Sequence, residues 1–438
     1  MTSPANTIAA LASGPGRAGV AVLRVSGPSA GAALLALAGP LPKPRIATLR
    51  TLMHKGEKLD SALALWLPGP ASFTGEDVAE LHIHGGPAVI EAVLGALLAQ
   101  PDLRLAEPGE FTRRAFAHGK MDLTQAEALA DLVEAETEGQ RRQALAQMAG
   151  ALGGLYENWR TRLTRLMALL EAEIDFPDED LPAGLSGRAL AILKPLQADM
   201  ADHLADQGRG ERVRDGYRVA IIGAPNAGKS SLLNALARRE AAIVSDIPGT
   251  TRDVVEVRLV LAGFPVWIAD TAGLREAADA IEAEGVRRAL ARAEAADLRI
   301  GALDGADPTG AGRALNGLIG PGDLTVWTKA DLAEPGSGAL AVSTRTGQGL
   351  AQLEALLAAR IAADLGGREA PALTRARHRA GVEAALAALG RAEAAAALGV
   401  ELAAEEARMA AAALGRLTGR IDVEDILGEI FASFCIGK

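Results

Sequence analysis

The chain has a single cysteine, Cys435, among its 438 residues. One thiol excludes an intramolecular disulfide and any metal site built from several cysteines, and it suits a reducing cytoplasm. Aromatic residues make up only 3% of the sequence, which argues against a platform of rings for stacking single-stranded bases. No apolar run approaches the roughly 18 residues that a membrane-spanning helix needs, so we expect no membrane segment.

Charge and length narrow the class of protein further. The net charge of −10 argues against wholesale coating of nucleic acid, so a nucleic-acid partner would need a local basic face or a second protein. The hydrophobic content of 49% is enough for sizeable cores. The length exceeds what one ordinary domain holds, and the sequence therefore predicts two or three domains.

Residues 223–230 (GAPNAGKS) match the pattern G-x-x-x-x-G-K-[ST] of a phosphate-binding loop. The apolar run 217–222 predicts a buried strand before the loop, and 229–238 has the spacing of a helix after it. Backbone N–H groups and the helix dipole would then meet at one point that favours an anion. Lys229 would reach the β- and γ-phosphates, and the Ser230 hydroxyl would bind Mg²⁺.

Further motifs follow in the order typical of a guanine-nucleotide switch domain. Asp270 directly follows a predicted strand, 264–269, and begins the string DTAG. This position places a carboxylate beside the metal. The string GTTRD at 249–253 offers a threonine hydroxyl to the same ion. Asp331 follows the predicted strand 324–327 and can accept hydrogen bonds from both guanine N1–H and guanine N2–H₂. Adenine does not offer this pair of donors. The string STR at 343–345, after strand 339–342, completes the base pocket.

Two positions depart from the usual motifs. Thr328 stands where the base-reading motif Asn-Lys-x-Asp has asparagine, so we expect weaker nucleotide binding with guanine selectivity resting on Asp331. Leu274 stands where Ras-like enzymes carry the glutamine that orients water. Hydrolysis then needs another group to orient the water. The candidates nearby in the sequence are Glu282 and two arginines, Arg252 and Arg275.

The flanking regions have different characters. Residues 1–118 read as an α+β unit with strands at 7–11, 19–25, 61–67 and 78–84 and a helix at 87–98. Helical Ala/Leu/Glu/Arg patterns occupy 126–152, 155–174 and 185–205, and they return at 374–416 and 419–434 after a last nucleotide-domain helix at 350–364. Helical sequence on both sides of the nucleotide domain suggests that this domain is inserted into one bundle.

For several polar residues the sequence allows both a structural and a functional interpretation. By pattern alone, Arg24, Glu80 and Lys120 are solvated charges on a sheet face, although they also sit where ligand contacts would sit. Cys435 is expected to be a buried thiol in a terminal helix, with a nucleophile as the alternative. A group of arginines is expected to form a solvated helix face, with an RNA-binding or partner-binding face as the alternative: Arg113, Arg114, Arg141, Arg142, Arg160, Arg162 and Arg165.

Strings outside the phosphate loop point to one family. They are PGRAGV (15–20), FTGEDV (73–78), HGG (84–86), GEFTRRAF (109–116), GKMDL (119–123), QAEA (125–128) and the closing FCIGK (434–438). With them the chain resembles, nearly end to end, the MnmE (TrmE) family of bacterial GTPases that modify the tRNA wobble uridine.

The resemblance implies a multidomain fold. It comprises an α+β N-terminal folate-binding and dimerisation domain (1–120), an α-helical bundle in two segments (121–215 and 371–438, the second with the CIGK tail), and an inserted α/β P-loop GTPase domain (216–370). It also implies a cytoplasmic homodimer that works on tRNA with an FAD-dependent MnmG-type protein, FAD and NADH being bound by that partner only.

The resemblance also implies site residues. Arg24, Glu80, Lys120 and Lys438 would bind 5-formyl-tetrahydrofolate, which replaces the solvated reading of the first three. Mg²⁺ would be held by Ser230 and Thr251, and K⁺ by Asn226, Ser245, Ile247 and Thr250, in the role of an arginine finger. Glu282 would orient water, with Lys229 as the second catalytic residue. The residues expected to contact GTP are Asn226, Ala227, Gly228, Lys229, Ser230, Ser231, Ser245, Asp246, Ile247, Pro248, Gly249, Thr250, Thr251, Asp270, Thr271, Ala272, Gly273, Thr328, Lys329, Asp331, Ser343, Thr344 and Arg345.

The alternative function is a regulatory GTPase of ribosome assembly. Such proteins carry an RNA-binding module or a second GTPase domain, whereas this sequence contains one phosphate loop and a long N-terminal unit. A dynamin-like membrane remodeller would need a membrane-inserting apolar or polybasic tip, and none is evident.

Overall fold

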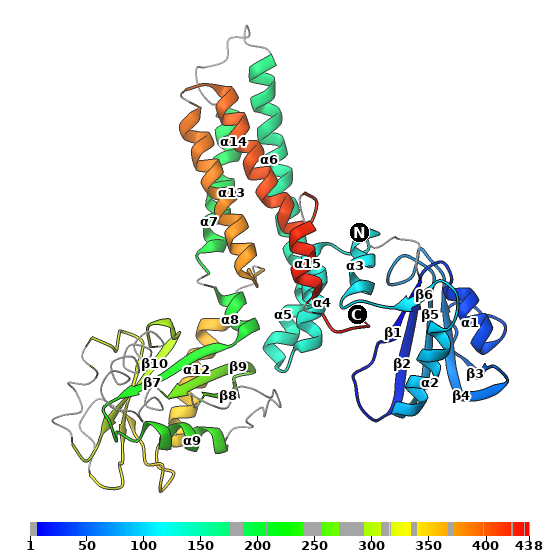
Figure 1. Ribbon diagram of the computed structural model, residues 1–438. Coiled ribbons are helices and arrows are strands. Elements are labelled where there is room, and N and C mark those ends of the chain that lie inside the picture. Colours follow the sequence, from blue (N-terminus) through cyan, green and yellow to red (C-terminus); the bar gives the residue numbers. More distant parts are fainter. Residues whose placement is uncertain are drawn as a thin grey trace, which may run out of the picture. The chain divides into compact units, whose positions relative to one another are not determined.

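The structure, a computed structural model, describes residues 7–175, 187–206, 208–239, 256–270, 293–307, 315, 317–333, 340–366, 371–396, 398–421, 424–432 and 434–437. Its contacts divide the chain into two compact units. The first comprises Met1–Ala130, Tyr156–Arg160 and Ala411–Lys438, and the second comprises Asp131–Leu155 and Thr161–Ala410. Each unit is built around a six-stranded sheet (Figure 1).

The sheet of the first unit has the order β3-β4-β5-β2-β1-β6. Its neighbouring strands are antiparallel except β1 and β6, which are parallel. Helices α1 (Ala30–Ala38) and α2 (Pro87–Leu98) bury their apolar residues against one face. The strands are β1 (Thr7–Leu11), β2 (Ala18–Ser26), β3 (Thr48–His54), β4 (Glu57–Leu67), β5 (Val78–Gly85) and β6 (Leu103–Leu105).

The opposite face of this sheet is less apolar and carries the charged pair described below. Helix α3 (Glu110–Ala117) inserts Phe111 against Ile8 and Ala10 on that face. Helices α4 (Leu123–Glu134) and α15 (Glu424–Ala432) pack beside it through a small aromatic cluster that includes Phe431 and Phe434. The end of the chain pairs with the first unit through the bridge Pro108–Ile436.

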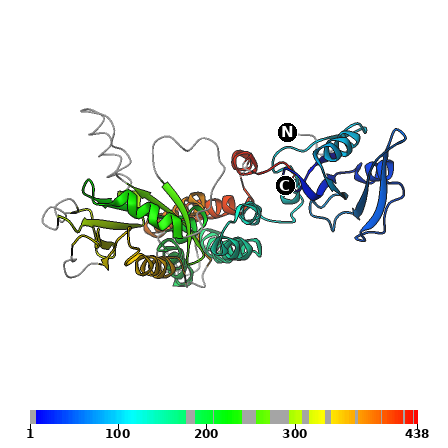
Figure 2. The same ribbon diagram turned by 90° about the horizontal axis from the view of Figure 1, so that it is seen from below.

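The sheet of the second unit has the order β12-β11-β10-β7-β9-β8 and is parallel apart from the β8–β9 hairpin. Helices α9 (Lys229–Arg239) and α12 (Leu350–Leu365) pack against the same face and close one core with it (Figures 1 and 2). The strands are β7 (Tyr217–Gly223), β8 (Glu256–Leu261), β9 (Phe264–Asp270), β10 (Leu298–Asp304), β11 (Leu324–Thr328) and β12 (Leu340–Ala341).

Helices that flank this sheet in sequence contact one another in space. Before it come α5 (Glu138–Met148), α6 (Ala151–Asp175), α7 (Gly187–Leu204) and α8 (Arg209–Asp215), and after it come α13 (Ala376–Ala395) and α14 (Val400–Thr418). Helix α13 packs along α7, with an ion pair between Lys194 and Glu393. The nucleotide-binding sheet is therefore inserted between helices that pack together.

Two of the expected helices are broken. The predicted helix 126–152 is divided into α4, α5 and the start of α6. Thr137 has extended backbone and caps α5 through a reciprocal capping box with Gln140, and Gly150 adopts a φ of 91° before α6. The predicted helix 374–416 is likewise interrupted between α13 and α14. Strands β3, β6, β8 and β10 were not expected from the sequence. Among the described residues, no helix is both long and apolar enough to cross a membrane.

Candidate functional site

The phosphate loop forms where β7 ends. Gly223 packs so closely on β10 that a Cβ there would lie 2.4 Å from the Ala302 carbonyl oxygen, so only glycine fits. Asn226 and Gly228 both adopt left-handed backbone, with φ of 62° and 81°. These turns bring the chain round to Lys229, where α9 begins with its free N–H groups directed at the loop.

Lys229 is nearly fully buried, and its ammonium group stays inside the loop. Nζ donates to the carbonyl oxygens of Gly223 at 3.0 Å and of Ala224 at 2.8 Å. A positive charge at the mouth of a helix N-terminus is an arrangement suited to binding phosphate.

Ser230 and Asp270 meet beside the loop. Asp270 is the last residue of β9, which pairs with β7 so that Ile221 and Asp270 are in register. Only 1% of Asp270 is exposed, and its carboxylate accepts a hydrogen bond from the Ser230 hydroxyl. A buried carboxylate oxygen and a hydroxyl oxygen in contact are hard ligands of the kind that Mg²⁺ prefers, so the donor set fits that ion.

Thr328 ties the phosphate loop to the base-reading segment. Its hydroxyl oxygen lies 2.6 Å from the carbonyl oxygen of Ala227 and 3.0 Å from that of Leu303. One hydroxyl has a single hydrogen to donate, so the two carbonyls share it, whereas an asparagine amide offers two. Thr328 therefore acts as a link between β10 and the loop.

The residues after β11 and β12 converge on Asp331. The Ser343 hydroxyl donates to Oδ1 of Asp331 at 2.6 Å, and Arg345 contacts Oδ2 at 2.7 Å. The Ser343 hydroxyl first, then the backbone N–H of Asp331 and the Arg345 guanidinium, hold the pKa of Asp331 below its usual value. Lys329 has left-handed backbone, with a φ of 57°, and reaches Asp304 at 2.6 Å.

A second constellation lies on the open face of the first unit's sheet. Arg24 on β2 and Glu80 on β5 face each other across neighbouring strands, and Nε of Arg24 lies 2.8 Å from Oε1 of Glu80. The Arg24 guanidinium lies 5.6 Å from the ring centre of Phe73 and 5.7 Å from that of Phe111. Both ring contacts favour a fixed orientation of the guanidinium. Lys120 donates to the Pro70 carbonyl at 2.9 Å.

Known proteins match nearly the whole chain. The family model for the TrmE N-terminus matches residues 7–120, and that for the MnmE helical domain matches residues 123–435. The tRNA modification GTPase MnmE of Parvibaculum lavamentivorans is 60% identical, covering 99% of this chain and 100% of its own. That of Maricaulis maris is 58% identical over 99% of both. The chain belongs to the MnmE family.

The family shows that the chain is a GTPase of tRNA modification with a TrmE-type N-terminal domain, a helical domain and a G domain. The family predicted from the sequence is thus confirmed. Among solved structures, the G domain of the T. maritima FeoB iron transporter is 24% identical, covering 33% of this chain and 98% of its own with a TM-score of 0.26.

Some predicted site residues of this MnmE-family chain lie outside the described residues. They are Ser245, Asp246, Ile247, Pro248, Gly249, Thr250, Thr251, Thr271, Ala272, Gly273, Glu282 and Lys438, together with Leu274, Arg252 and Arg275. Gly437, the last described residue, packs against β1. A Cβ on Gly437 would lie 2.0 Å from the Leu11 carbonyl oxygen.

Cys435 corrects an expectation. The sequence predicted a buried thiol in a terminal helix, but the thiol is exposed and lies beyond the end of α15. The neighbouring Phe434 takes the buried position against Phe431, which turns the next side chain outward.

The arginine group is largely ion-paired. Six members contact carboxylates: Arg113–Glu107, Arg114–Glu76, Arg141–Glu138, Arg142–Glu138, Arg160–Glu157 and Arg162–Asp199. Arg114 is only 11% exposed, so the expectation of a solvated position is wrong for this residue. Arg165 is exposed.

Three residues that shape these sites were not predicted from the sequence. Asp304, which pairs with Lys329, is the last residue of β10. This strand was not predicted because Arg299 and Gly301 interrupt its run of apolar residues. Phe73 and Phe111 hold Arg24 although they lie far from it in sequence. Phe73 lies in the string FTGEDV and Phe111 in the string GEFTRRAF. Because aromatic residues are rare in this chain, their presence in these family strings could have indicated a role at the site.

Proposed function

We propose that this chain is a K⁺-activated GTP hydrolase that modifies the wobble uridine, position 34, of certain tRNAs. With an FAD-dependent MnmG-type partner, which alone carries FAD and NADH, it would form 5-carboxymethylaminomethyluridine from a tetrahydrofolate one-carbon unit. The observation that carries the proposal is the contact between Ser230 and buried Asp270 beside the phosphate loop in a MnmE-family chain. This contact joins the loop to the strand that leads into the DTAG segment.

Two cations have distinct roles in this proposal. Ser230 and Thr251 would hold Mg²⁺, which would supply positive charge beside the phosphates. Asn226, Ser245, Ile247 and Thr250 would hold K⁺, which would supply a further positive charge where negative charge develops during hydrolysis. The exposed Asn226, held in left-handed backbone at the rim of the loop, is suited to contact such an ion. Glu282 orients the attacking water in place of the glutamine that Leu274 replaces, and Lys229 neutralises the phosphates.

The folate is proposed to bind at Arg24, Glu80, Lys120 and Lys438. The charged pair of Arg24 and Glu80 supplies donors and acceptors of the kind that a pterin ring needs, and the two lysines suit the carboxylates of a glutamate tail. Gly437, the last described residue, lies directly against Leu11 on the sheet that carries Arg24 and Glu80.

We propose a cytoplasmic homodimer with domains at 1–120, 121–215, 216–370 and 371–438. In it the N-terminal domains pair, and the G domains meet across the dimer when K⁺ is bound. Cycles of closing and opening in the G domains would then move the helical segments that enclose them in sequence.

One comparison of salts tests the central claim. GTP hydrolysis by the full chain is measured in KCl and, at equal ionic strength, in NaCl. The expected result is strong activation by K⁺ alone, which Asn226→Ala abolishes while nucleotide binding persists. Equal and slow rates in both salts would contradict the cation site and favour a regulatory GTPase that depends on a separate activating protein.

A further inference from the structure

Asp304 and Lys329 form an ion pair at the edge of the proposed base pocket. Asp304 is the last residue of β10 and Thr328 is the last residue of β11, and the two are partners in strand register. Lys329 follows directly, and its Nζ lies 2.6 Å from Oδ2 of Asp304. Asp304 is not among the residues proposed to bind GTP or a metal ion, and its role follows from the contacts of this pair.

The Asp304 carboxylate is held at both oxygens. Oδ1 accepts a 2.9 Å hydrogen bond from the Ala306 N–H, while Oδ2 faces Lys329. The side chain is only 14% exposed. Burial raises the pKa of Asp304, but the Lys329 ammonium and the Ala306 N–H overcome this effect and keep the pKa below its usual value. A fixed and charged carboxylate holds an ammonium group in one place.

The backbone of Lys329 is fixed as well. It adopts a left-handed conformation with a φ of 57°, which is uncommon for a residue with a side chain. On one side, the Thr328 hydroxyl contacts the Ala227 carbonyl in the phosphate loop, and on the other the Ala330 N–H donates to the Val342 carbonyl at 3.2 Å. Such backbone persists where its surroundings determine it, and it gathers at ligand sites.

Lys329 lies between two contacts proposed for the nucleotide. Thr328 precedes it and contacts the phosphate loop, and Asp331 follows it and is proposed to hold the guanine edge. A purine with its edge on Asp331 and its phosphates on the loop passes beside this lysine. Lysine lays its methylene stem along apolar surface while its ammonium keeps a polar partner.

We propose that Asp304 is a positioning residue for nucleotide binding. It holds the Lys329 ammonium, so that the lysine stem lies against the face of the purine ring. This inference rests on the proposed GTP contacts of Lys329 and Asp331. A contact with the ring face is the same for every purine, whereas hydrogen bonds to Asp331 depend on the groups at the ring edge. Asp304 therefore sets the affinity for purine nucleotides and leaves the preference for guanine to Asp331.

The test compares GDP with IDP, whose base lacks the guanine amino group. Both affinities are measured by calorimetry on the full chain with Mg²⁺. Asp304→Asn keeps the shape of the side chain but removes its charge, and it is expected to weaken both nucleotides about tenfold with the same GDP-to-IDP ratio. Wild-type affinity in folded Asp304→Asn, or a changed ratio, would overturn the proposal.

Hydrolysis gives a second readout of the same variant. The KM for GTP is expected to rise about tenfold in Asp304→Asn while kcat changes by less than about twofold, because the stem contacts the ring equally before and during hydrolysis. A fall in kcat at an unchanged KM would contradict a role in positioning the base.

A double-mutant cycle shows whether Asp304 acts through Lys329. Lys329→Met keeps an unbranched stem but removes the ammonium that Asp304 holds. Adding Asp304→Asn to Lys329→Met is expected to change GDP affinity by less than about twofold, since the interaction is already absent. A further loss of about tenfold in the double variant would show that Asp304 acts without Lys329, and it would refute the positioning role.

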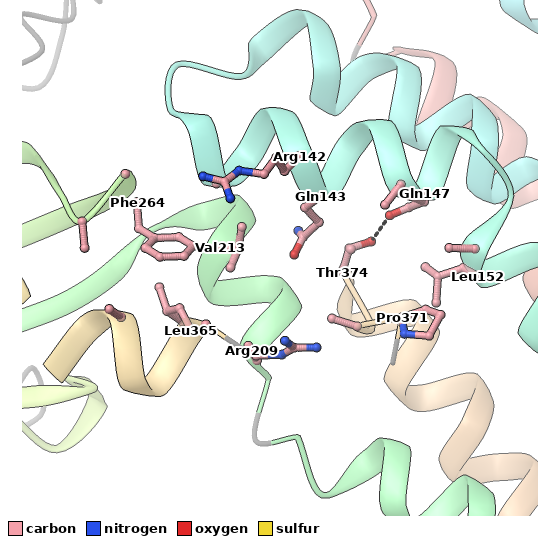
Figure 3. A pocket seen from close by; sticks show the side chains of 18 residues that line it. Arg142, Gln143, Gln147, Leu152, Arg209, Val213, Phe264, Leu365, Pro371 and Thr374 are labelled. Atoms are coloured by element: carbon pink, nitrogen blue, oxygen red, sulfur yellow. Dashed lines mark hydrogen bonds between the residues drawn. The ribbon is translucent and has the colours of Figure 1, made fainter. Parts of the chain in front are cut away.

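Two variants of the same unit serve as controls. Asp323→Asn removes a carboxylate that is 11% exposed and lies 3.4 Å from Arg299, near the opposite end of β10. Thr374→Val removes a buried hydroxyl that donates to Gln147 at 3.0 Å, in the wall of a cavity of about 490 Å³ (Figure 3). None of the residues proposed to bind GTP lines this cavity. Both controls are expected to bind GDP as the unaltered chain does, and a loss equal to that of Asp304→Asn would overturn the proposal.

Asp331→Asn separates this inference from the base pocket on which it rests. If Asp331→Asn changes the GDP-to-IDP ratio while Asp304→Asn binds both nucleotides normally, the base pocket stands and the positioning role is wrong. If Asp331→Asn and Lys329→Met both bind GDP and IDP as the unaltered chain does, the base pocket and the positioning role are both wrong.

Discussion

The Ser343 hydroxyl fixes the Asp331 carboxylate through a 2.6 Å hydrogen bond between segments that follow two different strands. Arg345 contacts the second carboxylate oxygen at 2.7 Å, so neither oxygen turns freely. Ser343 first, and then the backbone N–H of Asp331 and Arg345, keep the pKa of Asp331 below its usual value, and the group is charged at neutral pH. A charged, oriented carboxylate is the acceptor that two guanine N–H groups require.

Asp331→Asn is therefore expected to exchange the base preference. An amide donates where the carboxylate accepted, which matches the extra carbonyl of xanthine instead of the guanine amino group. GDP affinity should fall about tenfold or more and XDP affinity should rise. Titrations with the two nucleotides measure the ratio, and a retained preference for GDP would show that Asp331 does not read the base.

Thr328→Val is expected to weaken nucleotide binding. The change keeps the side-chain shape but removes the hydroxyl shared by the Ala227 and Leu303 carbonyls, at a cost of about 1–3 kcal/mol for a buried polar group left unpaired. GDP affinity should fall roughly tenfold because the phosphate loop loses its link to β10. Thr328→Ser keeps the hydroxyl and serves as the control. Equal GDP affinities of the two variants would contradict the proposed link between the phosphate loop and β10.

Arg24→Gln and Glu80→Gln are expected to weaken 5-formyl-tetrahydrofolate binding without changing K⁺-stimulated GTP hydrolysis. Each change leaves one member of the 2.8 Å ion pair without its partner on the sheet face. The loss should be about tenfold or more for each variant, measured by equilibrium dialysis. Lys58→Gln, at an exposed end of β4, is the matched control. Wild-type folate affinity in both variants would place the folate elsewhere.

Gly139→Ala and Gly154→Ala are expected to change the free energy of unfolding in opposite directions. A Cβ on Gly139 would lie 2.5 Å from the Phe264 ring, whereas a Cβ on Gly154 meets no atom within 4 Å. The first change should destabilise the second unit by about 1–3 kcal/mol through overpacking. The second should stabilise α6 by about 0.5–1 kcal/mol, because alanine favours a helix over glycine. Urea unfolding measures both, and equal shifts would argue against the close contact.

The stability of the first unit is expected to depend on Glu110 at low pH. Burial opposes the charged form, but Arg104, the Glu107 N–H and Arg114 overcome it and lower the pKa of Glu110 from 4.5 to about 2. A lowered pKa means that the stabilisation is fully present above pH 4.5 and is lost as the pH falls toward about 2. Its size is up to about 3 kcal/mol.

Glu110→Gln tests this dependence. The variant should be less stable than the unaltered chain near neutral pH, and the gap should narrow as the pH falls below 4.5. Denaturant unfolding of both proteins across that range gives the difference directly. A gap that stays constant down to about pH 2 would show that the carboxylate charge is not what stabilises the unit.

Local motifs needed no tertiary information. The strand before the phosphate loop and the helix that starts at Lys229 lie within one short segment, and the structure has them as expected. Their conformation depends on backbone angles and hydrogen bonds between near neighbours, which residue type largely determines. Helix α2, expected at 87–98, is likewise found at Pro87–Leu98.

Tertiary contacts decided where the long helical patterns break. The division at Thr137 depends on Gln140, which closes the capping box and also donates from its side chain to the Arg214 carbonyl at 2.8 Å. Alanine- and leucine-rich sequence favours a helix throughout this region, so propensity alone could not show the break.

The sequence by itself determined the family, the phosphate loop and the candidate residues, because these depend on residue identity at fixed spacing. Only the tertiary structure decided that Arg24 faces Glu80, that Phe73 and Phe111 flank it, and that Cys435 is exposed. Arg24 and Glu80 are separated by 56 positions in the chain. Strand register over such a distance is set by the packing of a whole sheet, which no local pattern contains.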